Sequence, residues 1–310
     1  MKILITGATG LIGKVVAVKA LKEGHKVHFL TTSENKIDAL PGCKGFLWNP
    51  SEGMIDAECF VGVHAIIHLA GATIAQKWTD KAKQEIIDSR VETTQLLFDH
   101  IDRINAGAMS SGLKFPVIMK FISGSAIGGY PSSLDKTYTE DYDGYASGFL
   151  GEVVQKWENV ADQFESIGVP VSYVRTGIVL SEKGGALEKI IQPIKYGVGA
   201  PLGSGKQWQS WIHIDDLARI FLYAVTSDIK GVINGTAPNP VTNAALTKVA
   251  AKQLNRPLIL PKVPKFALHL LLGDMAAIAL QSQKVVPAKL LEKGFSFTYN
   301  TVEEALEEIL

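Results

Sequence analysis

The sequence has few cysteines, no net charge and no long uninterrupted apolar run. Only Cys43 and Cys59 occur in 310 residues, without CxxC spacing and without histidines clustered around them. We therefore expect a reducing compartment, the cytoplasm, and no structural metal. The 31 basic and 31 acidic residues cancel, which gives no electrostatic footprint for nucleic acid or for an anionic membrane. The composition is that of an ordinary soluble globular protein. We expect a small-molecule substrate as its partner, and a monomer or a homodimer.

Targeting and membrane segments are also not evident. Residues 1–5 run straight into a glycine motif without a cleavage site, so they are expected to belong to the folded protein. The most apolar stretch, residues 266–280, is interrupted by His269, Gly273 and Asp274 and falls short of the roughly 20 residues that span a bilayer. We expect a buried helix there.

Short β-branched runs alternate with longer helical patterns up to about residue 180. This alternation predicts an α/β fold of the Rossmann type, with a doubly wound parallel sheet. Strands are expected at 2–6, 26–31, 45–48, 64–69, 117–123 and 169–175, and helices at 11–23, 79–104 and 148–166.

The second part of the sequence has a different texture. After Gly177, glycine and proline punctuate shorter elements, which predicts a smaller mixed lobe. We expect an NADP-binding domain at 1–180, completed by part of 214–240, and a substrate-binding lobe at 181–310. Helices at 216–226 and 243–254 are expected to return to the main sheet.

A glycine motif follows the first predicted strand and begins the first helix. Its first glycine permits a sharp turn, the second lets the backbone approach a pyrophosphate, and the third lets helix and strand pack closely. The helix N-terminus then offers free N–H groups to the phosphates. The residues expected to bind cofactor here are Gly7, Thr9, Gly10, Leu11, Ile12 and Gly13.

The end of the second strand decides which dinucleotide is bound. An acidic residue there would hold the ribose hydroxyls of NAD. Thr32, Ser33 and Lys36 offer hydroxyls and a cation that suit a 2′-phosphate, so we expect NADP(H). Glu34 could turn inward and select NAD, and Lys36 could lie on a solvated loop.

Several motifs together resemble one branch of the extended short-chain dehydrogenase/reductase superfamily. Beyond the glycine turn, they are His68-Leu69-Ala70-Gly71-Ala72, Phe121-Ile122-Ser123-Gly124-Ser125-Ala126, Ser89-Arg90-Val91, Lys156-Trp157-Glu158, Gly184-Gly185-Ala186-Leu187, Ser210-Trp211-Ile212-His213, Pro240-Val241-Thr242-Asn243 and Ser282-Gln283-Lys284-Val285. That branch is the atypical epimerase family, whose members are named NADP-dependent sugar-nucleotide epimerases. The resemblance implies the fold, NADP(H), and cofactor contacts from Leu69, Ala70, Gly71 and Ser123.

The catalytic residues of the wider superfamily are only partly matched. Those enzymes use a tyrosine, a lysine four residues later that lowers its pKa, and a serine that polarises the substrate. Ser125 matches the serine by position. Tyr145 is the candidate for proton transfer, but Phe149 stands where the lysine is expected, so no Tyr-x-x-x-Lys pair exists. Without an adjacent ammonium, a tyrosine keeps a pKa of about 10.

Two charged residues lie in the second predicted helix, at 79–104. Arg90 stands where the superfamily commonly has asparagine, and its guanidinium could bind a ribose or phosphate of the cofactor. Glu85 could orient Arg90 or contact the ribose itself. A solvated pair on the helix surface is the alternative, and it carries equal weight for Glu85.

Candidate substrate contacts come from Arg175 and from the second lobe. Arg175 ends the sixth predicted strand, where a structural role is an equal alternative to a cation in the cleft. Gln209 stands where nucleotide-sugar enzymes place an arginine on the substrate diphosphate, which weakens that interpretation. Trp208 and Trp211 could stack on a ring, although a tryptophan beside a strand more often belongs to the core. His213 is interpreted as scaffold, with Asp215 or Asp216 capping the next helix.

The sequence thus predicts an NADP(H)-binding oxidoreductase or epimerase acting on a small carbonyl, hydroxyl or sugar-type substrate. The alternative is a catalytically weak sensor or scaffold that responds to NADPH.

Overall fold

The computed structural model describes residues 1–107 and 117–310. An eight-stranded sheet forms its centre, in the order β12-β8-β6-β5-β1-β2-β3-β4. All neighbours run parallel except β3 and β4. The strands are β1 (Lys2–Thr6), β2 (Lys26–Thr31), β3 (Lys44–Asn49), β4 (Met54–Ile55), β5 (Ala65–His68), β6 (Lys120–Ala126), β8 (Val171–Thr176) and β12 (Gly231–Gly235). The strand order reverses between β1 and β5, where open α/β sheets bind ligands.

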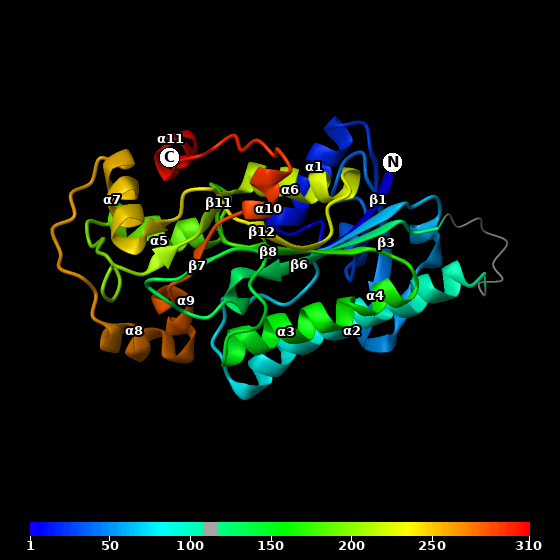
Figure 1. Ribbon diagram of the computed structural model, residues 1–310, viewed down its shortest axis with the longest axis horizontal. Coiled ribbons are helices and arrows are strands. Elements are labelled where there is room, and N and C mark those ends of the chain that lie inside the picture. The colour runs from blue at the N-terminus through cyan, green and yellow to red at the C-terminus, as the bar shows by residue number, and fades with distance from the viewer. Residues whose placement is uncertain (108–116) are drawn as a thin grey trace.

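Helices cover both faces of this sheet (Figure 1). On one side lie α1 (Leu11–Lys22) and α6 (Ile214–Thr226), and on the other lie α2 (Asp80–Asn105), α3 (Phe149–Ala161) and α4 (Gln163–Ser166). Adjacent residues of β5 show the two-sided burial: Ile66 packs in one core cluster and Ile67 in the other. This arrangement confirms the predicted doubly wound α/β sheet.

Some element boundaries differ from the prediction. The strand expected at 117–123 lies at Lys120–Ala126. The single helix expected at 148–166 is divided at Asp162 into α3 and α4. Short 3₁₀ turns occur at η1 (Glu34–Lys36), η2 (Pro50–Glu52), η3 (Ala57–Phe60), η4 (Ile127–Gly129) and η5 (Gly273–Met275).

Most of the remaining elements form a smaller lobe at the left of Figure 1. Two elements that follow residue 180 are not part of this lobe: β12 is the edge strand of the large sheet, and α6 packs on the face of that sheet beside α1. The other elements are β7 (Thr137–Tyr138), β9 (Ile178–Leu180), α5 (Ala186–Lys195), β10 (Trp208–Gln209), β11 (Trp211–His213), β13 (Val241–Thr242), α7 (Asn243–Gln253), α8 (Lys265–Leu272), α9 (Ala276–Leu280), β14 (Lys284–Val285), α10 (Ala288–Glu292) and α11 (Val302–Ile309).

The apolar stretch 266–280 is not the buried helix that was expected. It is broken at Gly273, and Phe266, Leu270 and Leu271 are 74%, 87% and 81% exposed. Asp274 in this stretch forms a 2.9 Å ion pair with Lys83 of α2, one of the helices that cover the large sheet. Within residues 1–107 and 117–310, no helix is long and apolar enough to cross a membrane.

The start of α6 also differs from the prediction. The cap is His213, whose Nδ1 accepts the amide of Asp215 at 3.1 Å, while its Nε2 lies 3.1 Å from Glu308. Asp216 is buried and accepts hydrogen bonds from the amides of Thr298 and Tyr299. These contacts give all three residues structural roles.

Candidate functional site

The glycine motif forms a tight turn between β1 and α1. Gly7 has φ of +66°, and a Cβ there would lie 2.7 Å from the carbonyl carbon and oxygen of Leu69. A Cβ on Gly13 would lie 2.3 Å from the Gly7 oxygen. The first residue before the helix is Gly10, and no described side chain caps it. The first amides of α1 are therefore left to bind an anion, as the sequence predicts.

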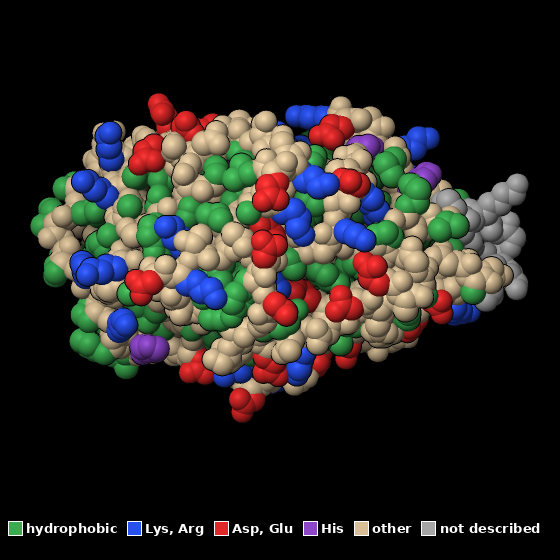
Figure 2. Space-filling view, viewed as in Figure 1, with side chains coloured by type: hydrophobic (Ala, Val, Ile, Leu, Met, Phe, Trp, Pro, Cys, Tyr) green, Lys and Arg blue, Asp and Glu red, His purple; other side chains and the backbone are tan. Residues whose placement is uncertain are grey.

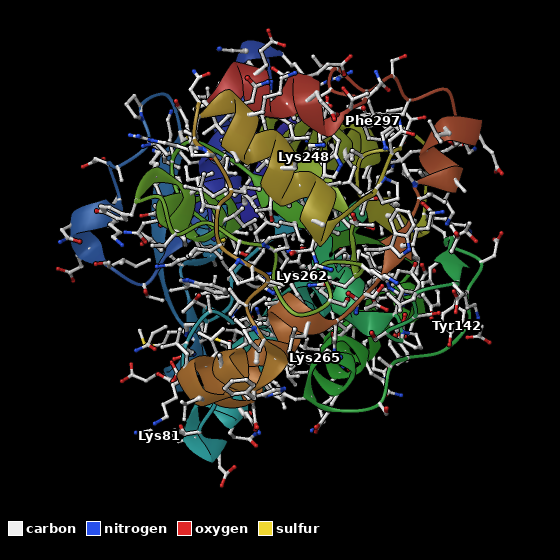
Figure 3. The ribbon with its side chains drawn as sticks, turned by 90° about the vertical axis from the view of Figure 1, so that its left-hand side faces the viewer. Lys81, Tyr142, Lys248, Lys262, Lys265 and Phe297 are labelled. Atoms are coloured by element: carbon white, nitrogen blue, oxygen red, sulfur yellow. The ribbon has the colours of Figure 1, made fainter. Side chains whose placement is uncertain are left out.

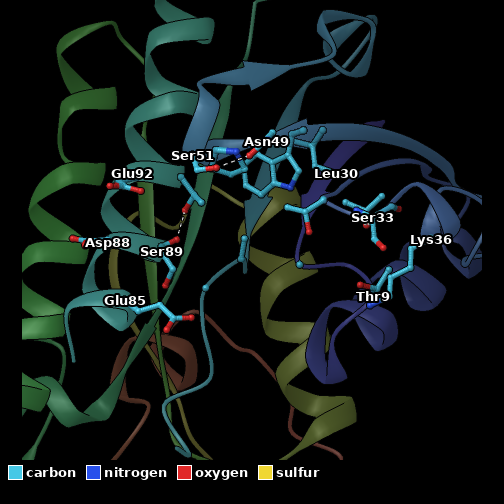
Figure 4. Close-up of a pocket in the computed structure, with 18 of the residues that line it drawn as sticks. Thr9, Leu30, Ser33, Lys36, Asn49, Ser51, Glu85, Asp88, Ser89 and Glu92 are labelled. Carbon is cyan, nitrogen blue, oxygen red and sulfur yellow. Dashed lines mark hydrogen bonds between the residues drawn. The ribbon is translucent and has the colours of Figure 1, made fainter. Parts of the chain in front are cut away.

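A groove of about 920 Å³ begins at this turn. Figure 4 shows its two walls: Thr9, Ser33 and Lys36 on one side, and side chains of α2 on the other. The lining comprises Gly7, Thr9, Leu30, Thr31, Thr32, Ser33, Lys36, Trp48, Asn49, Pro50, Ser51, Ala70, Gly71, Lys81, Gln84, Glu85, Asp88, Ser89, Glu92 and Thr93. Its volume is in the range of small-molecule and cofactor sites, about 300–1,000 Å³.

The two walls differ in charge. The wall at the end of β2 carries Lys36 beside the hydroxyls of Thr32 and Ser33, and Glu34 is not among the described residues that line the groove. The α2 wall carries three carboxylates, those of Glu85, Asp88 and Glu92, and one cation, Lys81, in the first turn of the helix. A phosphate would therefore be favoured on the β2 wall, away from the carboxylates.

A buried histidine connects the two walls. His68 Nδ1 lies 2.7 Å from the Thr6 hydroxyl, and its Nε2 lies 3.2 Å from the hydroxyl of Thr93. The Thr6 oxygen also accepts the amides of Leu69 and Ala70, both at 3.1 Å. Burial lowers the pKa of His68 to about 3, so the ring is neutral and bonds through both nitrogens. This chain of hydrogen bonds holds the glycine turn against α2.

Ser125 does not face an open site. Its hydroxyl donates a 2.5 Å hydrogen bond to Oε1 of Glu158, a residue of α3. Arg175, the cross-strand neighbour of Ser125, donates to both oxygens of Glu158 at 2.9 and 2.7 Å. All three side chains are almost fully buried. They form a bidentate ion pair with a serine attached to it.

Tyr145 completes the same cluster, donating a 2.8 Å hydrogen bond to Oε2 of Glu158. Burial and the Glu158 carboxylate raise the pKa of Tyr145 well above its usual value. This effect is opposite to that of the lysine in a Tyr-x-x-x-Lys pair, because a neighbouring anion disfavours the phenolate. The Tyr145 hydroxyl therefore stays protonated at neutral pH.

A smaller cavity of about 230 Å³ reaches this cluster. Tyr145, Glu158 and Arg175 line it together with acidic side chains of the 140–143 segment and with Asp162. Arg175 Nη1 has no hydrogen-bond partner among the described residues. The ion pair is thus linked to the surface through an acidic opening.

Arg90 is packed between α2 and α3 and is not among the described residues lining the groove. Its Nη1 donates to the carbonyls of Ile86 and Ala72, and its guanidinium lies 4.8 Å from the ring centre of Trp157. Burial lowers the pKa of Arg90 to about 10. Arg90 Nε and Trp157 Nε1 both lack acceptors among the described residues. The side chain lies behind Gly71, where a Cβ would come within 3.2 Å of it.

Other predicted contacts lie away from the groove. The Ser123 hydroxyl is buried and donates to the Gly124 carbonyl, while Leu69 and Ile12 pack against the core, and Leu11 touches the Gly185 loop. Trp211 is fully buried and donates to the Asn239 carbonyl. This burial corrects the expectation that Trp211 stacks on a substrate.

The remaining second-lobe candidates differ in exposure. Trp208 is partly exposed, donates to the Leu134 carbonyl, and has the Lys284 ammonium 4.4 Å from its ring centre. Gln209 is buried in the β10–β13 pair. No described residues form a cluster of three His, Cys, Asp or Glu side chains that could hold a metal ion.

Glu158 and His68 were not predicted as site residues. A signal for Glu158 was present: it occupies the apolar stripe of α3, four residues after Val154 and three before Ala161, where only a paired carboxylate is tolerated. His68 similarly ends an otherwise apolar strand. Their partners come from other strands and helices, which spacing does not reveal.

Two family models match the sequence. The NAD dependent epimerase/dehydratase family matches residues 3–235, which contain the large sheet and the groove. A domain of unknown function (DUF1731) matches residues 263–309, the segment from α8 to α11.

Full-length relatives are also similar. Epimerase family protein SDR39U1 homolog, chloroplastic, from Arabidopsis thaliana is 37% identical, covering 100% of this chain and 87% of the relative. Epimerase family protein YfhF from Bacillus subtilis is 35% identical, covering 100% and 98%. A crystal structure of human epimerase family protein SDR39U1 (isoform2) with NADPH superposes with a TM-score of 0.83 at 30% identity, covering 100% and 99%.

Proposed function

Because the chain belongs to the NAD dependent epimerase/dehydratase family, we propose that it binds NADP(H) and transfers hydride to or from a small carbonyl, hydroxyl or sugar-type substrate. The groove at the strand-order reversal is the observation that carries this proposal. It joins an uncapped helix N-terminus to a wall of hydroxyls and one lysine. The human relative solved with NADPH supports the same cofactor.

Each part of the groove suits a part of NADP(H). The amides at the start of α1 would hold the pyrophosphate. Ser33, Thr32 and Lys36 would hold the 2′-phosphate, on the wall opposite the α2 carboxylates. Leu30 and Trp48 would enclose the adenine, and Glu85 would face a ribose hydroxyl.

Glu158 supplies the base that the missing Tyr-x-x-x-Lys pair would otherwise provide. When bound, NADP(H) donates or accepts the hydride at the substrate carbon. Ser125 is almost fully buried, so the substrate would have to displace its covering side chains to reach it. In the oxidising direction, Ser125 Oγ would then accept the substrate hydroxyl proton while its own proton passes to Glu158 along the 2.5 Å hydrogen bond. Reduction reverses the two transfers. Arg175 holds the carboxylate in place, and the acidic cavity lets the proton exchange with water.

One observation favours a second candidate, an NADPH-responsive sensor without turnover. The Glu158 carboxylate already accepts four hydrogen bonds, from Ser125, Tyr145 and twice from Arg175. In this arrangement the carboxylate is fully hydrogen-bonded and serves as the structural counter-ion of Arg175.

Cofactor binding is tested by titrating the protein with NADPH and with NADH, following nicotinamide fluorescence and thermal stability. We expect saturable binding with NADPH preferred. The absence of binding at millimolar NADPH would contradict the proposal.

Turnover is tested by NADPH oxidation with a panel of aldehydes, ketones, quinones and nucleotide-linked keto sugars. The enzyme hypothesis requires that Ser125→Ala and Glu158→Gln each abolish a turnover seen in the unmodified protein, with NADPH binding retained. Full turnover in both variants contradicts the relay. NADPH binding without turnover on any compound supports the sensor.

A further inference from the structure

The exposed apolar side chains of α8 and of the segment before it form a single surface feature. We name it the α8 patch: Ile259, Leu260, Phe266, Leu270 and Leu271, with Lys262 and Lys265 between them. Phe266 and Leu270 are four residues apart, so they project from the same side of the helix. Only Leu268 of α8 is buried. In Figure 2, hydrophobic side chains gather at the lower left, over α8, beside Lys and Arg side chains.

Basic residues predominate around the patch, and the nearest acidic residue in the sequence after it, Asp274, is paired with Lys83. From residue 229 to residue 273 the sequence has no Asp or Glu, but it has Lys230, Lys248, Lys252, Arg256, Lys262 and Lys265. With 31 basic and 31 acidic residues in the whole chain, the rest of the molecule carries a net charge of −6. Figure 3 shows Lys248, Lys262 and Lys265 along one end of the molecule. No membrane partner was expected because the net charge of the whole chain is zero. That zero is the sum of a cationic segment and an anionic remainder.

We propose that the α8 patch docks onto the surface of an anionic lipid bilayer. Apolar side chains that project beside lysines match the interfacial region of such a bilayer, where the apolar groups enter the acyl boundary and the ammonium groups meet lipid phosphates. The long stem of Lys265 allows both contacts at once. The Lys262 ammonium donates to the Ser204 carbonyl at 2.7 Å and would exchange this bond for a lipid phosphate.

Two structural features favour lipid over other occupants. None of the five apolar side chains lines either cavity described above. They project, and a bilayer accepts projecting groups without a complementary pocket. A second copy of the chain, related by a two-fold axis, would bring the lysines of one patch against those of the other, which like-charge repulsion disfavours.

The test is co-sedimentation of the full chain with vesicles. We expect binding to vesicles of phosphatidylcholine and phosphatidylglycerol in equal amounts, at least tenfold weaker binding to phosphatidylcholine alone, and weaker binding at high salt. Leu270→Glu with Leu271→Glu should reduce binding at least tenfold, and Lys262→Glu with Lys265→Glu should reduce it selectively on the anionic vesicles. Val18→Glu and Lys22→Glu, on exposed positions of α1, are the matched controls and should bind like the unmodified protein.

Each variant is also titrated with NADPH and analysed by sedimentation velocity. Unchanged NADPH binding shows that a loss of vesicle binding is not a loss of folding, and it separates this proposal from that on function. Failure of the unmodified protein to bind anionic vesicles overturns the proposal. So does a dimer that Leu270→Glu dissociates, because the patch would then be an interface between copies.

Discussion

The hydroxyl of Tyr145 donates a 2.8 Å hydrogen bond to the carboxylate of Glu158. The superfamily tyrosine is instead paired with a cation, which makes its phenolate accessible. Here the pKa of Tyr145 is raised by burial and by the Glu158 charge, so the tyrosine acts as a fixed donor. The proposed function therefore assigns proton transfer to the carboxylate and to Ser125, which donates to the other carboxylate oxygen.

Cofactor selectivity should depend on Lys36. Lys36→Ala removes the cation from the β2 wall of the groove. Since a hydrogen bond to a charged group contributes about 1.5–3 kcal/mol, we expect NADPH to bind roughly 10- to 100-fold more weakly, with NADH unchanged. Calorimetric titration of both nucleotides measures this, with Lys22→Ala as the control. Equal losses for NADPH and NADH would place the 2′-phosphate elsewhere.

Gly13 should not tolerate a side chain. In Gly13→Ala the new Cβ would lie 2.3 Å from the Gly7 carbonyl oxygen, which is backbone and cannot move aside. We expect a loss of about 1–3 kcal/mol in the free energy of unfolding and loss of NADPH binding. Urea unfolding and NADPH fluorescence provide the two readouts. Gly24→Asn, at a positive-φ turn with open space, should behave like the unmodified protein.

The Glu158–Arg175 pair should be strongly coupled. Glu158→Gln leaves the buried Arg175 charge without a counter-ion, which typically costs about 3–5 kcal/mol. Glu158→Gln combined with Arg175→Gln removes both charges, so at least half of that loss should be recovered. A double-mutant cycle by urea unfolding measures the coupling. Additive losses would show that the two residues act independently.

Acid stability should depend on His68. The folded-state pKa is about 3, below the unfolded value of about 6.5, so the unfolded state binds more protons as the pH falls through this window. The neutral His68 ring makes its full contribution to the free energy of unfolding above the unfolded-state pKa. That free energy falls on acidification, by about 2–3 kcal/mol between pH 7 and pH 4.5.

His68→Asn removes the titrating group and keeps an acceptor for Thr6. Its free energy of unfolding should therefore fall less steeply with acid than that of the unmodified protein, in urea unfolding at a series of pH values. His269→Asn, at an exposed position, should retain the original slope. The same slope in all three proteins would exclude His68 as the cause.

Local signals predicted much of the fold. The glycine turn was predictable because only glycine fits two of its positions: Gly7 has a positive φ, and Gly13 has no room for a Cβ. The apolar strands and the helix that begins after Thr79 follow from periodicity and capping. Together with the parallel connections, these signals bring Thr9, Ser33 and Lys36 to one edge of the sheet, where the structure has them.

Signals that depend on distant partners were missed. Glu158 contacts Ser125 and Arg175 only when α3 packs across β6 and β8. The spacing of residues in the sequence does not predict how the helix lies on these strands. The stretch from Phe266 to Leu280 is as apolar as a core helix, but hydrophobicity does not say whether another element covers it. His213 caps α6 because its backbone is extended there, although an aspartate is the commoner cap.

The ion pair between Lys83 and Asp274 has a thermodynamic consequence. Lys83 immediately precedes Gln84 and Glu85 in the groove wall, and Asp274 follows α8 by two residues. A ligand that displaces the first turn of α2 therefore also acts on the segment that carries the α8 patch. Such coupling is reciprocal. If a ligand in the groove changes the proposed affinity of the α8 patch for a bilayer by some factor, bilayer binding changes the affinity of the groove for that ligand by the same factor. Because the pair is exposed, this mutual effect weakens as salt is added.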